Sequence, residues 1–232
     1  AGTTSPAYIS MERVGAPSFN WASNNLLTRN GLDALGNKIH GTPRAQNSVS
    51  VSSTTISSLP FAEFSEITLT YFGSPYIIQQ ILVVPLGKTL KIQPGAVLRF
   101  DDSKEIEIRG NLEAIGKESE KIIFTRNSAS SPGNDRYRLH FIESQNSQIE
   151  NANFIDGGRL TYVPFYAPWG YISGVIEAEN SILSIKNSLI TGAFPRGINS
   201  SGIITIENTT IEGTRNSSDF FNTFALLVRG SD

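Results

Sequence analysis

From Gly73 onward, short apolar segments alternate with turns rich in Gly, Asn and Pro. Such brief runs bounded by turn residues predict β-strands rather than helices. The predicted strands cover residues 77–85, 89–92, 96–100, 105–108, 121–125, 137–143, 148–155, 174–178, 182–190, 202–211 and 224–229. Many short strands with almost no helical period indicate an all-β fold.

The first part of the chain has a different texture. Residues 1–71 are punctuated by Asn, Ser, Thr, Gly and Pro, which favours turns and loops. Two alternating pairs, Val49 with Val51 and Ile67 with Leu69, are typical of half-buried strands, and residues 26–35 could form one short helix. We therefore predict a β-rich, irregular capping or docking region over residues 1–72.

An internal repeat distinguishes among the all-β architectures. Residues 149–154, 185–190 and 206–211 each read Ile, charged, Asn, two variable residues, apolar. The first two repeats are 36 residues apart and the last two are 21 apart, which fits a coil of about 21 residues with one insertion of 15. A period of this size predicts a solenoid, here a right-handed parallel β-helix over residues 73–232.

The repeated asparagines, Asn151, Asn187 and Asn208, are expected to form a structural ladder. In a parallel β-helix, equivalent residues of successive coils stack about 4.8 Å apart. Asn tolerates the left-handed backbone of a tight bend, and its amide can bond the same group in the next coil. Asn is also common in ordinary turns, but its recurrence within a matched pattern favours the ladder.

Four segments resemble the right-handed parallel β-helix proteins of the pectate-lyase-like superfamily, of the secreted or surface type. They are residues 74–78 (SPYII), 84–100 (VPLGKTLKIQPGAVLRF), 108–116 (IRGNLEAIG) and 121–125 (KIIFT). The resemblance extends over about residues 73–232 and implies the fold, but these coils occur in lyases, adhesins, surface-layer components and phage spikes, so it implies no single function. One departure is the sequence YRLH at 137–140, where the family often has a Trp-Gly-Gly-Ile type of coil.

A weaker resemblance covers residues 9–47. The strings ISMERV at 9–14, NWAS at 20–23 and GTPRAQN at 41–47 are similar to the closing segment of a lamin-tail-like domain, an immunoglobulin-type β-sandwich. The earlier strands of such a sandwich would precede Ala1. This resemblance implies that the chain is a fragment of a longer protein.

Composition narrows the partners and the compartment. Lys and Arg number 19 against 21 Asp and Glu, so the broad positive field of nucleic acid-binding proteins is missing. The chain has no Cys, which excludes disulfides and thiolate sites, and its apolar runs are far shorter than the roughly 20 residues of a membrane span. The start at Ala1 with a small polar run resembles a processed, exported chain, so we expect an extracellular or cell-surface location.

Side chains that could carry catalysis are scattered. A β-helix lyase would need acidic residues holding calcium and a basic side chain on one face. Asp101 and Asp102 are adjacent and more consistent with a turn, and Asp156 with Arg159 flanks a Gly-Gly turn that we interpret as solvated. The later Asp residues are too widely spaced for the clustered Asp set of a hydrolase. We identify no catalytic residue, no metal site and no cofactor motif.

The two histidines are interpreted as structural or exposed. His40 lies beside Gly41 in a turn-rich segment. His140 lies in a predicted strand whose nearest carboxylate, Glu143, is an odd number of residues away and therefore faces the other side.

The insertion, at about residues 159–173, is rich in aromatic residues. They are Tyr162, Phe165, Tyr166, Trp169 and Tyr171. Exposed rings can anchor a protein interface or stack on sugars, and they can also cover an apolar flank of the solenoid. Glycosylation sequons at Asn199 and Asn216 fall in predicted loops, whereas the one at Asn208 belongs to the ladder.

The last predicted strand, 224–229, is followed by no capping segment before Asp232. An uncovered solenoid end exposes backbone groups and apolar stacks, which favours another chain binding there. We therefore expect a non-enzymatic structural protein, a subunit of a surface layer, sheath or filament or an adhesin segment, that self-associates through its solenoid ends and N-terminal region. The alternative is a carbohydrate-binding or polysaccharide-cleaving β-helix protein.

Overall fold

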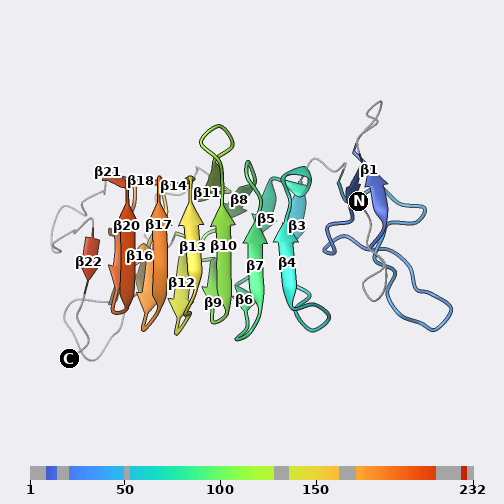
Figure 1. The fold of residues 1–232 in the computed structure, drawn as a ribbon, viewed down its shortest axis with the longest axis horizontal. Coiled ribbons are helices and arrows are strands. Elements are labelled where there is room, and N and C mark those ends of the chain that lie inside the picture. Colours follow the sequence, from blue (N-terminus) through green and yellow to red (C-terminus); the bar gives the residue numbers. More distant parts are fainter. Residues whose placement is uncertain are drawn as a thin grey trace.

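The computed structural model of the chain describes residues 9–14, 21–49, 53–127, 136–161, 171–212 and 226–228. Its regular structure is β-strand except for one short 3-10 helix, η1 (Tyr71–Gly73). Most strands belong to three parallel sheets that stack coil upon coil along the long axis of the molecule (Figure 1). The prediction of an all-β parallel β-helix is confirmed.

From β4 (Glu66–Leu69) onward, each coil adds one strand to each sheet, in the same order, and β3 (Thr54–Ile56) precedes them in the second sheet. The first sheet contains β4 (Glu66–Leu69), β7 (Thr89–Ile92), β10 (Asn111–Ile115), β13 (Ser147–Glu150), β17 (Ile182–Lys186) and β20 (Ile203–Glu207). The second contains β3 (Thr54–Ile56), β5 (Tyr76–Ile78), β8 (Val97–Phe100), β11 (Ile122–Arg126), β14 (Ala152–Ile155), β18 (Leu189–Thr191) and β21 (Thr210–Glu212). The third contains β6 (Leu82–Val84), β9 (Glu105–Ile108), β12 (Arg138–Ile142), β16 (Tyr171–Glu179), β19 (Arg196–Ser200) and β22 (Leu226–Val228).

The register agrees with the sequence repeat. Ile149 lies opposite Ile185, and Ile185 lies opposite Ile206, all in the first sheet. The earlier coils are similar in length, because Ile67 pairs with Leu90 and Leu90 with Leu112. Several segments predicted as one strand are in fact two strands that meet at a corner of the coil.

The core is a column of apolar side chains inside the solenoid. In the solenoid strands whose side chains the structure describes, alternate residues point inward, and those at the centre of the column are fully buried. Phe124 stacks on Phe154 in the next coil with ring centroids 4.6 Å apart, and Phe100 stacks on Tyr137 at 4.6 Å. Tyr137 is fully buried, and its hydroxyl donates to the carbonyl of Phe124 at 2.8 Å. The stacked rings are therefore closely packed, and the Tyr137 hydroxyl, the one polar group among them, has a hydrogen-bond partner.

The solenoid begins earlier than the predicted boundary at residue 73. β3 pairs in parallel with β5, and β4 pairs in parallel with β7, so residues 54–69 already belong to the stacked sheets. The alternating pattern of Ile67 and Leu69 was the sequence signal for this coil. The irregular loops of this first coil obscure the repeat in the sequence.

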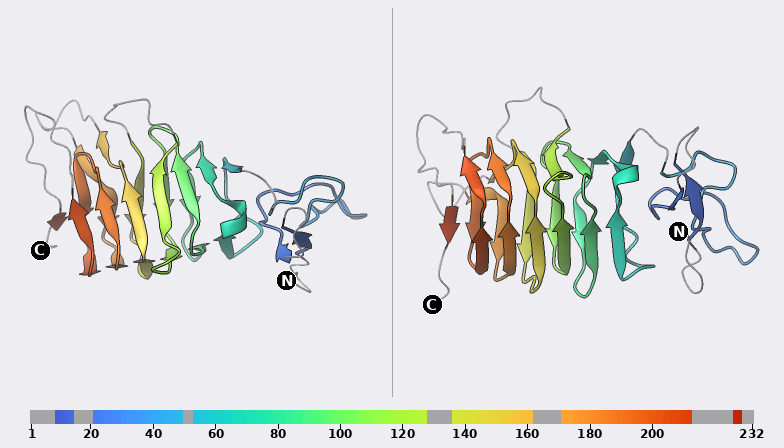
Figure 2. Two further views of the ribbon diagram at one scale, coloured as in Figure 1. Left: turned by 90° about the horizontal axis from the view of Figure 1, so that it is seen from above. Right: turned by 45° about the horizontal axis from the view of Figure 1, so that its top comes forward.

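The N-terminal module, residues 9–49, lies at one end of the solenoid (Figure 2). Among its described residues, the paired strands are β1 (Met11–Arg13) and β2 (Trp21–Ser23), which are antiparallel. Residues 26–35 form bends and turns rather than a short helix, and Leu26, at the start of this segment, has a left-handed backbone with a φ of 59° that a right-handed helix cannot include.

The module packs against the first coil. Leu26 belongs to the same buried cluster as Ile56 and Phe61. Arg29 forms an ion pair with Glu63 at 2.6 Å, and the ring of His40 contacts Phe64 edge to face. These contacts give the module the position of a cap over the apolar column. No helix among the residues that the structure describes is long and apolar enough to cross a membrane.

Candidate functional site

Charged side chains gather on the outer face of the third sheet. Side chains alternate along a strand, so Ile106 and Ile108 of β9 point into the core while Glu105 and Glu107 point outward. The parallel register places Arg138 opposite Glu105 and His140 opposite Glu107. Adjacent coils thus bring residues more than 30 positions apart into one row.

β16 and β19 continue these rows. Glu177 of β16 lies opposite His140 on one side and opposite Asn199 of β19 on the other. Glu179 is the next outward residue of β16, opposite Ile142. Arg159, at the start of β15 (Arg159–Thr161), approaches from the antiparallel hairpin at the base of the insertion.

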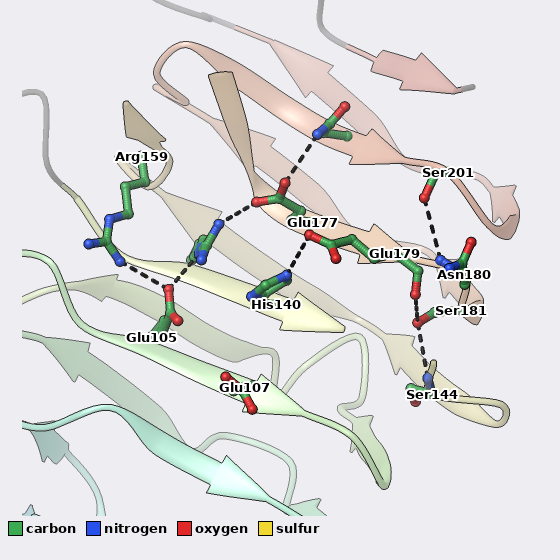
Figure 3. Close-up of polar contacts among 12 residues, drawn as sticks. Glu105, Glu107, His140, Ser144, Arg159, Glu177, Glu179, Asn180, Ser181 and Ser201 are labelled. Carbon is green, nitrogen blue, oxygen red and sulfur yellow. Dashed lines mark hydrogen bonds and ion pairs between the residues drawn. The ribbon is translucent and has the colours of Figure 1, made fainter. Parts of the chain in front are cut away.

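Ion pairs and hydrogen bonds connect the cluster across coils (Figure 3). The guanidinium of Arg138 donates through Nε to Glu105 Oε2 and through its NH1 group to Glu177 Oε2. Arg159 donates to the same Oε2 of Glu105 at 3.2 Å. The amide of Asn199 donates to Glu177 at 3.3 Å. Four successive coils are therefore joined through side chains as well as through backbone.

Two further contacts complete the cluster. Arg109 Nε lies 2.6 Å from Glu107 Oε1, and His140 Nε2 lies 3.0 Å from Glu179 Oε1. The edge of the cluster is more open than its centre, because Arg109 and Glu179 are about half exposed, at 52% and 51%. We call these residues, Glu105, Glu107, Arg109, Arg138, His140, Arg159, Glu177 and Glu179, the outer charge cluster.

The centre of the outer charge cluster is buried and fully ionised. The side chain of Glu105 is 6% exposed and that of Arg138 is 14% exposed. Burial alone would raise the pKa of Glu105, but the hydrogen bond and charge of Arg138, helped by Arg159, hold that pKa below its ordinary value. Burial alone would lower the pKa of Arg138, and its two carboxylate partners raise it instead. The central carboxylate is therefore an anion and not a proton donor.

One buried nitrogen of the cluster, on His140, has no hydrogen-bond partner among the described residues. His140 is 9% exposed, and its Nδ1 is buried without a hydrogen bond. One ligand atom each from Glu105, Glu107 and His140 lie within 4.8 Å of one another, which makes these three the group that could hold a metal ion among the described residues. The arrangement can clamp coils together, and it can offer nitrogen and oxygen ligands to a cation.

The asparagine ladder has left-handed backbone at each of its three positions. The φ angles are 49° at Asn151, 50° at Asn187 and 47° at Asn208, where the first and second sheets meet. Asn208 donates from Nδ2 to Asn187 Oδ1 at 3.3 Å, while Asn187 donates to Glu150 and Asn151 to the carbonyl of Gly116. One direct amide-to-amide bond is present, and the other two amides bind nearer acceptors.

The remaining candidates lie apart from the outer charge cluster. Asp101 and Asp102 form a corner turn, as expected, and accept hydrogen bonds from Asn127 and Arg126 at 2.8 Å. Asp156 lies 3.9 Å from Arg136, whereas Arg159 reaches Glu105.

The structure does not describe most of the aromatic insertion or one of the two sequons predicted in loops. Tyr162, Phe165, Tyr166, Trp169 and Asn216 lie outside the described residues. Tyr171 begins β16 and pairs with Thr161 in the hairpin. Asn199 lies in β19, and its side-chain amide donates a hydrogen bond to Glu177. The sequence predicted a loop at this position. The apolar alternation at 196–200 is weak, which is why this strand was missed.

Sequence reasoning missed the outer charge cluster. Along the sequence, the carboxylate nearest to His140 is that of Glu143, whose odd spacing from His140 predicts that it faces the other side of the strand. The neighbours of His140 in space, Glu107 and Glu179, come from the coils before and after. A usable signal was present in the sequence, because residues 105–108 (EIEI), 138–141 (RLHF) and 177–179 (EAE) each alternate charged and apolar residues. The departure from the β-helix family pattern at 137–140 also contributes Arg138 and His140.

No protein-family model, curated protein or solved structure matches the chain. The fold assignment therefore rests on the sheets, register and core of the chain itself.

Proposed function

We propose that the chain is a non-enzymatic structural protein of the cell surface or extracellular space, in which the solenoid is a rigid spacer. The observation that supports this best is the state of the outer charge cluster. A glycosidase or lyase acid must hold a proton at working pH, which requires a raised pKa. The buried carboxylate of this cluster has a lowered pKa and is held by two arginines.

The same contacts are well suited to stiffening. Arg138 links β9, β12 and β16 by bonding Glu105 and Glu177, and Asn199 extends the connection to β19. A buried guanidinium fork holds its partners in fixed geometry. Bending the solenoid at this face would separate buried charges, which is costly.

An end-to-end contact is the proposed mode of assembly. The inward-facing Ile204, Ile206 and Ile211 of the β20–β21 coil are partly exposed, whereas Leu183 and Ile185 one coil earlier are buried to 1% and 0% exposure. Stacking another subunit on this coil would cover these side chains and pair the edge strands. The N-terminal module covers the opposite end of its own solenoid, so it is the surface that such a subunit would meet.

Electron microscopy of the purified full chain, with a mass-per-length measurement, tests this proposal. We expect stiff rods or ordered fibres of stacked chains. Ile204→Lys should reduce the particles to single chains, while the matched change Ile203→Lys, at the 65% exposed outward neighbour, should leave the fibres intact. Discrete wild-type monomers that degrade a polysaccharide would contradict the proposal.

Membership of the pectate-lyase-like superfamily and the surface location are part of the same proposal. The three-sided parallel solenoid and its left-handed asparagine corners support the superfamily. The location is supported by the resemblance to secreted and surface β-helix proteins. The lamin-tail-like resemblance of residues 9–47 stays a prediction.

Carbohydrate binding is the second candidate, supported by an open hollow beside the corner that joins the first and second sheets. Tyr71, which is 59% exposed, lines this hollow together with Gln93, Lys117 and Glu118. An exposed ring next to amide and charged groups is a surface on which a sugar can stack and form hydrogen bonds. Affinity electrophoresis through gels containing acidic or neutral polysaccharides tests it, with retardation expected for the wild type and lost in Tyr71→Ala.

A further inference from the structure

We propose that Glu105, Glu107 and His140 bind a divalent transition-metal ion of the zinc type on the outer face of the third sheet. One ligand atom from each residue lies within 4.8 Å of the others. Glu107 and His140 are register partners in β9 and β12, so the parallel pairing itself fixes their proximity. The ion would join two successive coils.

His140 provides the strongest evidence. Its Nε2 faces Glu179 at 3.0 Å, and because a carboxylate only accepts hydrogen bonds, Nε2 carries a proton in this contact. The other nitrogen, Nδ1, is buried without a hydrogen-bond partner, and in the neutral tautomer it is the nitrogen whose lone pair is left to bind an ion. A carboxylate on one ring nitrogen with the other left for an ion is the usual arrangement of a metal-binding histidine.

The carboxylates retain oxygens for the same ion. Arg138 and Arg159 both bind Oε2 of Glu105, and Arg109 binds Oε1 of Glu107. Oε1 of Glu105 and Oε2 of Glu107 accept no hydrogen bond from the residues that the structure describes. The arginines therefore hold the two carboxylates in place without occupying both of their oxygens. Figure 3 shows the His140 ring between Glu179 on one side and Glu105 and Glu107 on the other.

The charge of the cluster favours a cation. Four carboxylates are joined with three guanidinium groups, so one negative charge is left when His140 is neutral. A buried lone pair that faces two carboxylates is repelled unless a positive charge lies between them. A metal ion at this point would remove the repulsion and satisfy Nδ1.

The donor set selects the class of metal. One imidazole and two carboxylates suit Zn²⁺ and its analogue Co²⁺, whereas Ca²⁺ and Mg²⁺ prefer oxygen ligands alone. Tetrahedral zinc at its usual bond lengths places ligand atoms about 3.3 Å apart. Small side-chain rotations would bring the three atoms to that separation, and a water molecule would be the fourth ligand.

Isothermal titration of the full chain with Zn²⁺, purified without a polyhistidine tag and after chelation, tests the proposal. We expect one ion per chain, and a Co²⁺ absorption spectrum typical of tetrahedral coordination. His140→Ala should abolish this binding, and Glu179→Gln should weaken it about 10–100-fold by loosening the histidine.

The chain provides a matched control, because His40 is its only other histidine. His40 contacts Phe64 and lies near Glu63, in the N-terminal module, so His40→Ala should bind zinc like the wild type. Circular dichroism would check that each variant keeps its β-structure. The proposal is overturned if folded wild type binds no Zn²⁺, if binding survives His140→Ala, or if nitrogen NMR shows both ring nitrogens of His140 protonated and unchanged by Zn²⁺.

Discussion

The N-terminal module and the solenoid each bury a carboxylate, and they stabilise it differently. Glu12 of the module is 4% exposed and accepts hydrogen bonds from neutral groups of Asn24, Thr42 and Ser48. Glu105 of the solenoid is 5% exposed and is held by the cations Arg138 and Arg159. Both carboxylates remain ionised, but only the second needs charges from other coils.

This difference follows from how each region is built. The described part of the module has one two-stranded sheet. The carboxylate of Glu12 therefore holds its loops together, and it also accepts a hydrogen bond from the backbone amide of Ser48 at 2.7 Å. The solenoid has continuous parallel sheets and an apolar column. Its ion pairs therefore add rigidity to a structure that backbone hydrogen bonds and apolar packing already hold together. The two regions should therefore fail in different ways when they are perturbed.

The largest effect is expected in the apolar column of the solenoid. Phe124→Ala removes a fully buried ring from the stack with Phe154 and should lower the free energy of unfolding by about 3–5 kcal/mol. Urea denaturation followed by circular dichroism measures it. The neighbouring outward residue provides the control, since Ile123→Thr should cost under about 1 kcal/mol. Equal losses in the two variants would contradict the stacking role.

Removing the central cation of the outer charge cluster should rank second. Arg138→Met leaves Glu105 and Glu177 without their shared guanidinium and should cost about 3 kcal/mol in the same urea experiment. Arg109→Met, which breaks a pair whose arginine is 52% exposed, should cost under about 1 kcal/mol. A small loss for Arg138→Met would mean that the cluster does not hold the coils together.

Acid should loosen the module through Glu12. Burial alone would raise the pKa of Glu12, but the hydrogen bonds from Ser48, Asn24 and Thr42 outweigh it and lower that pKa. A lowered folded-state pKa stabilises the fold above the unfolded-state value of about 4.3, and this stabilisation is lost as pH falls through the folded-state pKa. The protection of the Ser48 amide, measured as its exchange rate relative to the unstructured rate at the same pH, should therefore fall below about pH 4.

Glu12→Gln is the matched variant for that experiment. It removes the titrating group and leaves neutral partners, so it should destabilise the module by about 1–3 kcal/mol near neutral pH. Its Ser48 amide should already be poorly protected, with no further loss of protection between pH 5 and pH 3, a range that brackets the ordinary Glu pKa of about 4.3. An unchanged acid step in the variant would show that another group causes it.

The smallest expected effect concerns the asparagine corners. Asn187→Ala places a residue with Cβ and no side-chain amide at a φ of 50°, and should cost about 1 kcal/mol. Asn187→Gly loses the same amide contacts with Glu150 and Asn208. Because it also removes the backbone strain, it should cost less than Asn187→Ala. Urea midpoints compare the two variants. A lower midpoint for Gly than for Ala would show that the left-handed backbone does not determine the cost at this corner.

Much of the fold could be predicted because its signals are local. The repeat at Ile149, Ile185 and Ile206 gave both the coil length and the register of the first sheet. The boundary at residue 73 was too late, because the first coil, with β3 and β4, carries irregular loops that obscure the period. The candidate site could not be predicted in the same way, since its members come from strands on neighbouring coils.

The sequence by itself determined the solenoid, its apolar interior and the residues suited to its corners. These features depend on the alternation of side chains within a strand and on the backbone preference of single residues such as Asn187. The tertiary structure alone decided which outward charges meet. Coils of unequal length separate contacting residues by 33 positions for Glu105 and Arg138 and by 39 for His140 and Glu179. Only the parallel register of whole coils brings such residues together, because no fixed spacing in the sequence relates them.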